Sequence, residues 1–78
     1  MRRKTITERQ KTKFYNDFGL RCKELRKKEG LSQEDMMSYG FSTRFYQRIE
    51  AGKPLHFDTV IRLSKAFDIS LSKLLEGL

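Results

Sequence analysis

The sequence predicts an all-α protein, a compact bundle of five helices. Apolar residues recur at intervals of three and four, and no segment alternates apolar with polar residues for long enough to indicate a strand. Helical segments are also predicted to end near four residues, Gly30, Gly40, Gly52 and Asp68. The segments between them have helical length and are joined by short connections. With 78 residues, it has room for one domain.

The first helix is predicted to begin near Glu8, because Thr7 and Gln10 have the spacing of a capping box. Gly30 supplies a C-terminal stop, whereas Gly19 weakens the middle of the helix. One apolar stripe runs along this segment at positions i, i+4, i+8 and i+11, formed by Phe14, Phe18, Cys22 and Leu25.

Three later helices share one kind of start, a serine N-cap with an apolar residue before it and another four residues into the helix. The hydroxyl satisfies a free backbone N–H, and the apolar pair fixes how the chain enters the helix. The caps are Ser32, Ser42 and Ser70, with the pairs Leu31 and Met36, Phe41 and Tyr46, and Ile69 and Leu74. They predict helices near 32–38, 43–50 and 71–76.

The remaining helix is predicted over about 57–67, after Pro54, whose missing N–H costs little in a loop. The side predicted to face the core consists of Phe57, Val60, Ile61, Leu63, Ser64 and Phe67.

The net charge of +7 is concentrated at the N-terminus. Residues 1–13 carry six Lys and Arg against one Glu, a balance of +5, whereas residues 14–78 carry 11 Lys and Arg against 9 Asp and Glu, a balance of +2. We therefore expect residues 1–7 to form a basic arm and residues 8–78 to form the folded domain. Charge alone leaves two interpretations of the arm open, a solvated tail and a nucleic-acid contact.

Cys22 and His56 are the single cysteine and the single histidine, so neither an internal disulfide nor a four-ligand zinc site can form. We expect no cofactor and no metal. We also expect no enzymatic activity, because no nucleophile–base pair or carboxylate constellation can be assembled. A lone thiol fits a reducing compartment, which predicts a cytoplasmic protein. No apolar run reaches the roughly 18 residues that cross a membrane, and no secretory signal is recognisable.

Residues 31–53 predict two short helices joined by a tight turn, Tyr39-Gly40-Phe41, in which Gly40 can adopt the left-handed conformation. Advancing about 100° per residue along the second helix puts Tyr46 and Ile49 on the side that faces the core. The opposite side carries Arg44, Gln47, Arg48 and Ala51, with Thr43 nearby. This is the pattern of a helix-turn-helix.

The outward side has the chemistry of base recognition. Arginine can pair with guanine O6 and N7, and glutamine with adenine N6 and N7, in the major groove of DNA. The Thr43 hydroxyl can meet a base or a phosphate. The alternative is an ordinary solvated helix face. Phe45 lies at the edge of the buried side, either as part of the core or as a contact to a thymine methyl or a sugar.

A series of short motifs extends this pattern from about Phe18 to Leu75. They are Leu25-Arg26, Gly30-Leu31-Ser32-Gln33-Glu34, Gly40-Phe41-Ser42, Arg48-Ile49-Glu50, Gly52-Lys53, Leu63-Ser64-Lys65-Ala66-Phe67, Ile69-Ser70 and Leu74-Leu75. In this order and spacing the sequence resembles the phage repressor and Cro helix-turn-helix family, the XRE type. The resemblance implies a lambda-repressor-like DNA-binding domain.

The resemblance also implies roles for single residues. Base-reading positions are Thr43, Arg44 and Arg48, with Gln47 beside them on the same face. Gln33 is expected to bind a phosphate and support the start of the recognition helix. Ser42 and Lys53 are expected near the DNA backbone, and Arg26 and Glu50 are expected to form an ion pair. An arm of Arg2, Arg3 and Lys4 has a precedent in the family.

Two departures from the family pattern concern the first helix of the motif. Six residues separate Gln33 and Gly40, where the family usually has seven, and Met37 stands where a small residue is common. We expect these departures to shift the recognition helix relative to the family geometry.

Together these features predict a sequence-specific transcriptional regulator that binds a palindromic operator in double-stranded DNA as a homodimer, because one short helix reads too few bases. The dimer surface is predicted at Leu71, Leu74, Leu75 and Leu78, with core packing as the alternative for these residues. The alternative function is an antitoxin-like module whose partner is a protein such as a toxin. A bulky exposed apolar patch outside the recognition face would favour that role.

Overall fold

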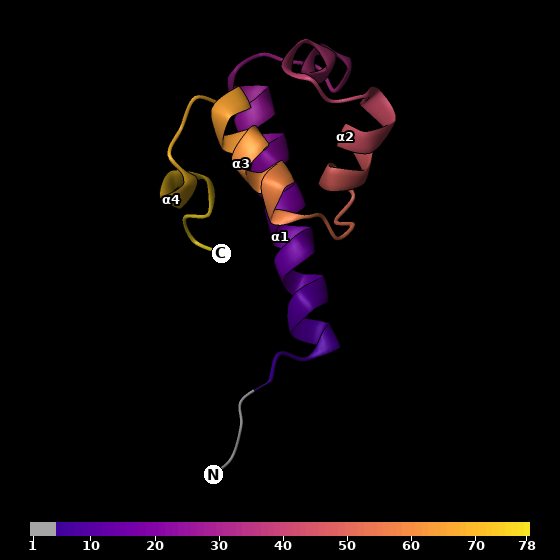
Figure 1. The fold of residues 1–78 in the computed structure, drawn as a ribbon, viewed down its shortest axis with the longest axis vertical. Helices are drawn as coiled ribbons and strands as arrows, with labels where there is room; N and C mark the ends of the chain where they lie inside the picture. The colour runs from indigo at the N-terminus through magenta and orange to yellow at the C-terminus, as the bar shows by residue number, and fades with distance from the viewer. Residues whose placement is uncertain (1–4) are drawn as a thin grey trace.

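The computed structural model describes residues 5–78, in which five helices follow one another. They are α1 (Glu8–Lys28), the 3-10 helix η1 (Glu34–Tyr39), α2 (Thr43–Glu50), α3 (Phe57–Ala66) and α4 (Leu71–Leu74). No strand occurs within residues 5–78, so the prediction of an all-α, five-helix protein is confirmed. Figure 1 shows α1 running along the molecule, with the other helices gathered around its C-terminal half.

The helix starts that the sequence predicts are present. The Thr7 hydroxyl accepts a hydrogen bond from the Gln10 backbone N–H at 3.1 Å, and the Gln10 side chain accepts one from the Thr7 N–H at 2.8 Å. Ser42 accepts from the Phe45 N–H, and Ser70 from that of Lys73, each at 3.1 Å. These caps place the first residues of α1, α2 and α4 where local sequence predicted them.

The helix predicted near 32–38 is instead a 3-10 helix, Glu34–Tyr39. Its N-cap is Gln33, whose side chain makes no capping hydrogen bond, so the predicted cap Ser32 lies one residue earlier. The Ser32 hydroxyl accepts from the Asp35 N–H at 3.1 Å, and the Asp35 carboxylate accepts from the Ser32 N–H at 2.7 Å. A 3-10 helix rises about 2.0 Å per residue against about 1.5 Å in an α-helix. Six residues in this winding therefore span the length of about eight α-helical residues.

The core is one cluster between α1 and the four other helices. Each apolar pair that flanks a serine cap has both members in this cluster or packed against it. The buried apolar side chains are Phe18, Cys22, Met36, Phe41, Tyr46, Ile49, Val60, Leu63, Phe67 and Leu74.

Three residues predicted in apolar stripes facing the core are exposed. Phe57 retains 58% of its surface and Ile61 37%, because the buried side of α3 is centred on Val60 and Leu63 and leaves both residues at its edge. Phe14 is 38% exposed, although its ring stacks on that of Phe18 with centroids 6.2 Å apart. None of the helices within residues 5–78 combines the length and the apolar character needed to cross a membrane.

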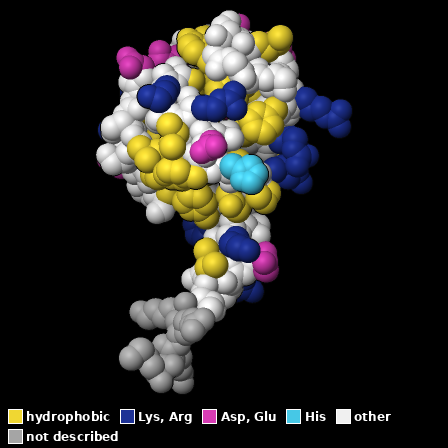
Figure 2. Space-filling model, in the orientation of Figure 1, with side chains coloured by type: hydrophobic (Ala, Val, Ile, Leu, Met, Phe, Trp, Pro, Cys, Tyr) yellow, Lys and Arg dark blue, Asp and Glu magenta, His cyan; other side chains and the backbone are white. Residues whose placement is uncertain are grey.

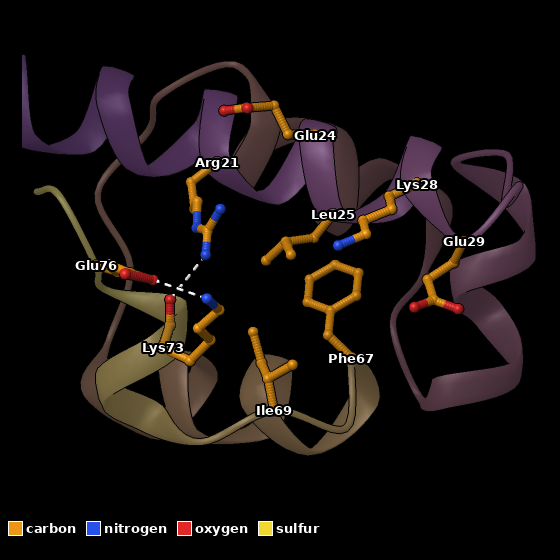
Figure 3. A pocket seen from close by; sticks show the side chains of 9 residues that line it. All are labelled: Arg21, Glu24, Leu25, Lys28, Glu29, Phe67, Ile69, Lys73 and Glu76. Atoms are coloured by element: carbon orange, nitrogen blue, oxygen red, sulfur yellow. Dashed lines mark hydrogen bonds and ion pairs between the residues drawn. The ribbon is translucent and has the colours of Figure 1, made fainter.

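The last helix is shorter than the predicted 71–76 and docks on α1 through Arg21. The Arg21 guanidinium donates to the carbonyl oxygens of Lys73 at 2.8 Å and Leu74 at 3.3 Å. Figure 3 shows this side chain reaching across to α4. Carbonyl groups in the last turn of a helix lack partners within the helix, so Arg21 satisfies them from α1. Leu74 is fully buried, which makes it a core residue of this chain.

Candidate nucleic-acid interface

The two sides of α2 differ as the helical periodicity predicts. Tyr46 and Ile49 are buried, with 0% and 2% of their surface exposed. The four residues that the sequence places opposite them, Arg44, Gln47, Arg48 and Ala51, are all exposed. Thr43, predicted nearby, is half-buried. A helix anchored by two buried side chains thus presents a row of hydrogen-bonding groups to the solvent.

A buried ion pair lies beneath this helix and joins it to α1. Arg26 donates from Nε to Oε2 of Glu50 at 2.6 Å and from Nη2 to Oε1 at 3.1 Å, and only 8% and 5% of the two side chains are exposed. A third donor, Arg26 Nη1, binds the carbonyl oxygen of Leu31 at 2.8 Å. Burial favours the neutral form of the Glu50 carboxyl, but hydrogen bonds led by that from Arg26 hold its pKa below the usual value.

Gln33 extends this network to the exposed side of α2. Its Nε2 donates to Glu50 Oε1 at 3.0 Å, and its Oε1 accepts from Gln47 Nε2 at 3.3 Å. The resemblance implied that Gln33 supports the start of the recognition helix, whereas here it contacts side chains in the second half of α2. The Gln47 amide is thereby tied, through Gln33, to the buried pair.

Tyr46 supports α2 from inside. Its ring is fully buried, and its hydroxyl reaches the Cys22 carbonyl oxygen at 3.5 Å. Burial raises the pKa of the Cys22 thiol to about 12 and also raises the pKa of Tyr46. Both groups are therefore neutral at pH 7, and this part of the interface between α1 and α2 carries no charge of its own.

The turn before α2 is fixed by an arginine that the sequence analysis did not single out. Gly40 has a φ of 90°, the left-handed conformation expected of it. Arg62 of α3 donates to the Gly40 carbonyl oxygen at 2.7 Å and stacks its guanidinium 4.5 Å from the ring centre of Phe41. No local pattern marks Arg62, because its partners are about 20 residues away in the chain.

Phe45 lies at the rim of the interface. Its ring stacks on that of Phe41 with centroids 6.3 Å apart, and 38% of the residue is exposed. It therefore contacts the core with one face while the other remains open to a ligand.

The residues predicted to contact the DNA backbone lie at the two ends of α2. The Ser42 hydroxyl caps the helix through an accepted hydrogen bond, so its proton remains free to be donated to a phosphate. Lys53 is exposed in the loop that follows α2. Arg2, Arg3 and Lys4, the predicted arm contacts, lie outside the described residues.

Two short helices, a left-handed glycine turn and a second helix with an anchored inner side and a polar outer side define a helix-turn-helix DNA-binding domain. The family model for helix-turn-helix proteins matches residues 23–74, two thirds of the chain. The protein thus belongs to the helix-turn-helix family, of the XRE/Cro type, and is a DNA-binding regulator. No curated protein and no solved structure matches the chain.

Proposed function

We propose that the protein is a sequence-specific transcriptional repressor that inserts α2 into the major groove of a palindromic operator as a homodimer. The observation that carries this proposal is the exposed row of Arg44, Gln47 and Arg48 above the buried Arg26–Glu50 pair. In this proposal Arg44 and Arg48 pair with guanine, Gln47 pairs with adenine, and Thr43 contacts a base in the first turn.

The backbone contacts position the helix. Ser42 and Lys53 bind phosphates at the two ends of α2, and Gln33 uses the amide proton that the network leaves free. Residues 1–7 act as a basic arm whose Arg2, Arg3 and Lys4 add phosphate contacts. Repression follows from occupancy of the operator, and the protein acts in the cytoplasm, at the nucleoid.

Selection of bound fragments from random duplex DNA tests this function. We expect enrichment of a two-fold symmetric motif whose half-sites lie about 10 base pairs apart, on one face of the duplex. Footprints on the selected DNA should then show two protections related by a two-fold axis. Failure to enrich any sequence above the starting pool would contradict sequence-specific binding.

The second candidate function is a protein-interaction module, such as an antitoxin that binds a toxin. It is favoured by large apolar side chains that are exposed outside α2, among them Ile6, Phe14, Phe57 and Leu78. The two functions differ in what covers this apolar surface. In the repressor it is a second copy of the chain, and in the antitoxin-like module it is a different protein.

A further inference from the structure

Two shallow apolar grooves meet at Phe14, in the N-terminal half of α1. One is lined by Ile6, Lys13, Asp17 and Leu78 and the other by Leu55, Phe57 and Leu75, and Phe14 belongs to both. We call this surface the stem face. Figure 2 shows hydrophobic side chains gathered on the lower part of the body, next to the protruding helix.

We propose that the stem face is the surface on which a second copy of this chain docks, with a two-fold axis passing between the two copies of Phe14. The inference rests on the proposed function, since it assigns the homodimer a surface. Of the four C-terminal leucines predicted as the dimer surface, it keeps Leu75 and Leu78 and excludes Leu74, which is fully buried in its own chain. It adds the N-terminal half of α1 together with Phe57.

The N-terminal end of α1 is isolated from the other helices (Figure 1). In Figure 1 the N-terminal turns of α1 extend past the other four helices, and Ile6 and Phe14 retain 62% and 38% of their surface. Short helical turns without a packed apolar side are marginal in water. A second copy supplies the missing partner.

The exposed apolar area of the stem face is close to that of one half of a dimer interface. With about 200 Å² for a large apolar side chain, the exposed fractions of Ile6, Phe14, Phe57 and Leu78 correspond to roughly 400 Å² of apolar surface. A stable interface buries about 800 Å² per partner, of which a little more than half is apolar. The stem face therefore has the apolar area that one half of a dimer needs.

The stem face carries one charge of each sign at its edge. Lys13 and Asp17 lie on either side of Phe14 along α1 and pair within the chain at 2.6 Å, with 76% and 38% of their side chains exposed. A two-fold axis at Phe14 brings each Lys13 near Asp17 of the other copy. A surface that carries one charge of each sign matches itself in this way, whereas a partner of a single charge satisfies only one of the two residues.

The stem face does not include the side of α2 that is proposed to read DNA. Arg44, Gln47 and Arg48 line neither groove. A dimer formed through the stem face thus leaves the outer side of both α2 helices open.

Light scattering and sedimentation of the full chain over a concentration series test the proposal. We expect the wild type to dimerise, and Phe57→Glu to raise the dimer dissociation constant at least about 100-fold, because two carboxylates lose their solvation at the interface. Phe57 is largely exposed, so the fold tolerates this change. The control is Leu20→Glu, equally exposed at 56% on another side of α1 and part of neither groove, which should dimerise as the wild type does.

A charge exchange separates a second copy from any other partner. Lys13→Asp and Asp17→Lys each place two like charges at the stem face, so each variant alone should be monomeric. An equimolar mixture of the two should recover the dimer, because opposite charges then meet at both contacts across the axis. A mixture that stays monomeric overturns the two-fold arrangement.

The remaining outcomes are equally decisive. A wild type that is monomeric both free and on DNA overturns the inference, and so does a Phe57→Glu variant that dimerises normally. A monomer that captures a toxin-like protein through Phe57 assigns the stem face to that partner and overturns it as well. A dimer that responds to these changes but selects no DNA sequence upholds the inference while contradicting the proposed function.

Discussion

Gly19 in α1 lies directly against the backbone of α2 at Ile49. A Cβ atom added at Gly19 would stand 2.7 Å from the Ile49 carbonyl oxygen and 2.8 Å from that of Glu50. The recognition helix therefore rests on α1 at a distance that only glycine allows. From the sequence alone, Gly19 was predicted only to weaken the middle of the helix.

Gly19→Ala should destabilise the protein by about 2 kcal/mol. Alanine gains roughly 1 kcal/mol in helix propensity, but overpacking against backbone atoms that cannot move aside costs more. Thermal and urea unfolding measure the difference. Thr12→Ala, exposed on the same helix, is the control and should leave stability unchanged or slightly raised. A Gly19→Ala protein as stable as the wild type contradicts the close approach.

Glu50→Ala should cost about 3–5 kcal/mol in the free energy of unfolding, because it leaves the buried Arg26 guanidinium without its partner. The double variant Arg26→Met with Glu50→Leu should recover most of that loss, since no unpaired charge remains. Chemical denaturation of the three proteins provides the measurement. If the Glu50→Ala variant were as stable as the double variant, the Arg26 guanidinium would not be an uncompensated buried charge.

Low pH should lower the free energy of unfolding, because it protonates the Glu50 carboxylate. The pKa of this carboxyl is lowered in the folded state, so its stabilising contribution is fully present above the unfolded-state value of about 4.5 and is lost as the pH falls through the lower folded-state value. Asp35 and Glu76, whose pKa values are also lowered, add to the acid sensitivity of the wild type. The difference in melting temperature between wild type and Glu50→Gln should therefore shrink below about pH 4.5. A difference that is constant from pH 7 to pH 3 rules out the linkage.

Deleting residues 1–5 should lower affinity for all DNA sequences alike. If Arg2, Arg3 and Lys4 each neutralise one phosphate, the slope of log affinity against log salt should flatten by up to roughly three units. Discrimination between operator and scrambled DNA should survive, because phosphate contacts carry no sequence information. A change of preference at A·T-rich flanks would indicate a minor-groove arm, and an unchanged slope and affinity a solvated tail.

Much of this structure could be predicted from local sequence. The caps at Thr7, Ser42 and Ser70, and the division of α2 into buried and exposed sides, depend on residues within one or two turns of each other. The 3-10 winding of η1 was not predicted, because the same apolar spacing fits either kind of helix over six residues.

Contacts between segments far apart in the chain could not be predicted from local sequence. The place of Gly19 under α2 and the reach of Arg62 to Gly40 are set by packing of segments 20 or more residues apart. The exposure of Phe57 followed from how α3 is rotated on the core, which its apolar pattern left undetermined.

Titration of two variants on two duplexes decides whether α2 reads DNA sequence through its outer side. Arg44→Ala and Arg48→Ala should each weaken binding to the selected operator by about 1–3 kcal/mol, with little loss on a scrambled duplex and no change in melting temperature. Lys73→Ala is the control, because α4 lies on the opposite side of the molecule from α2 in Figure 1. Equal losses on both duplexes, or a wild type that binds the two alike, would contradict sequence reading by these residues.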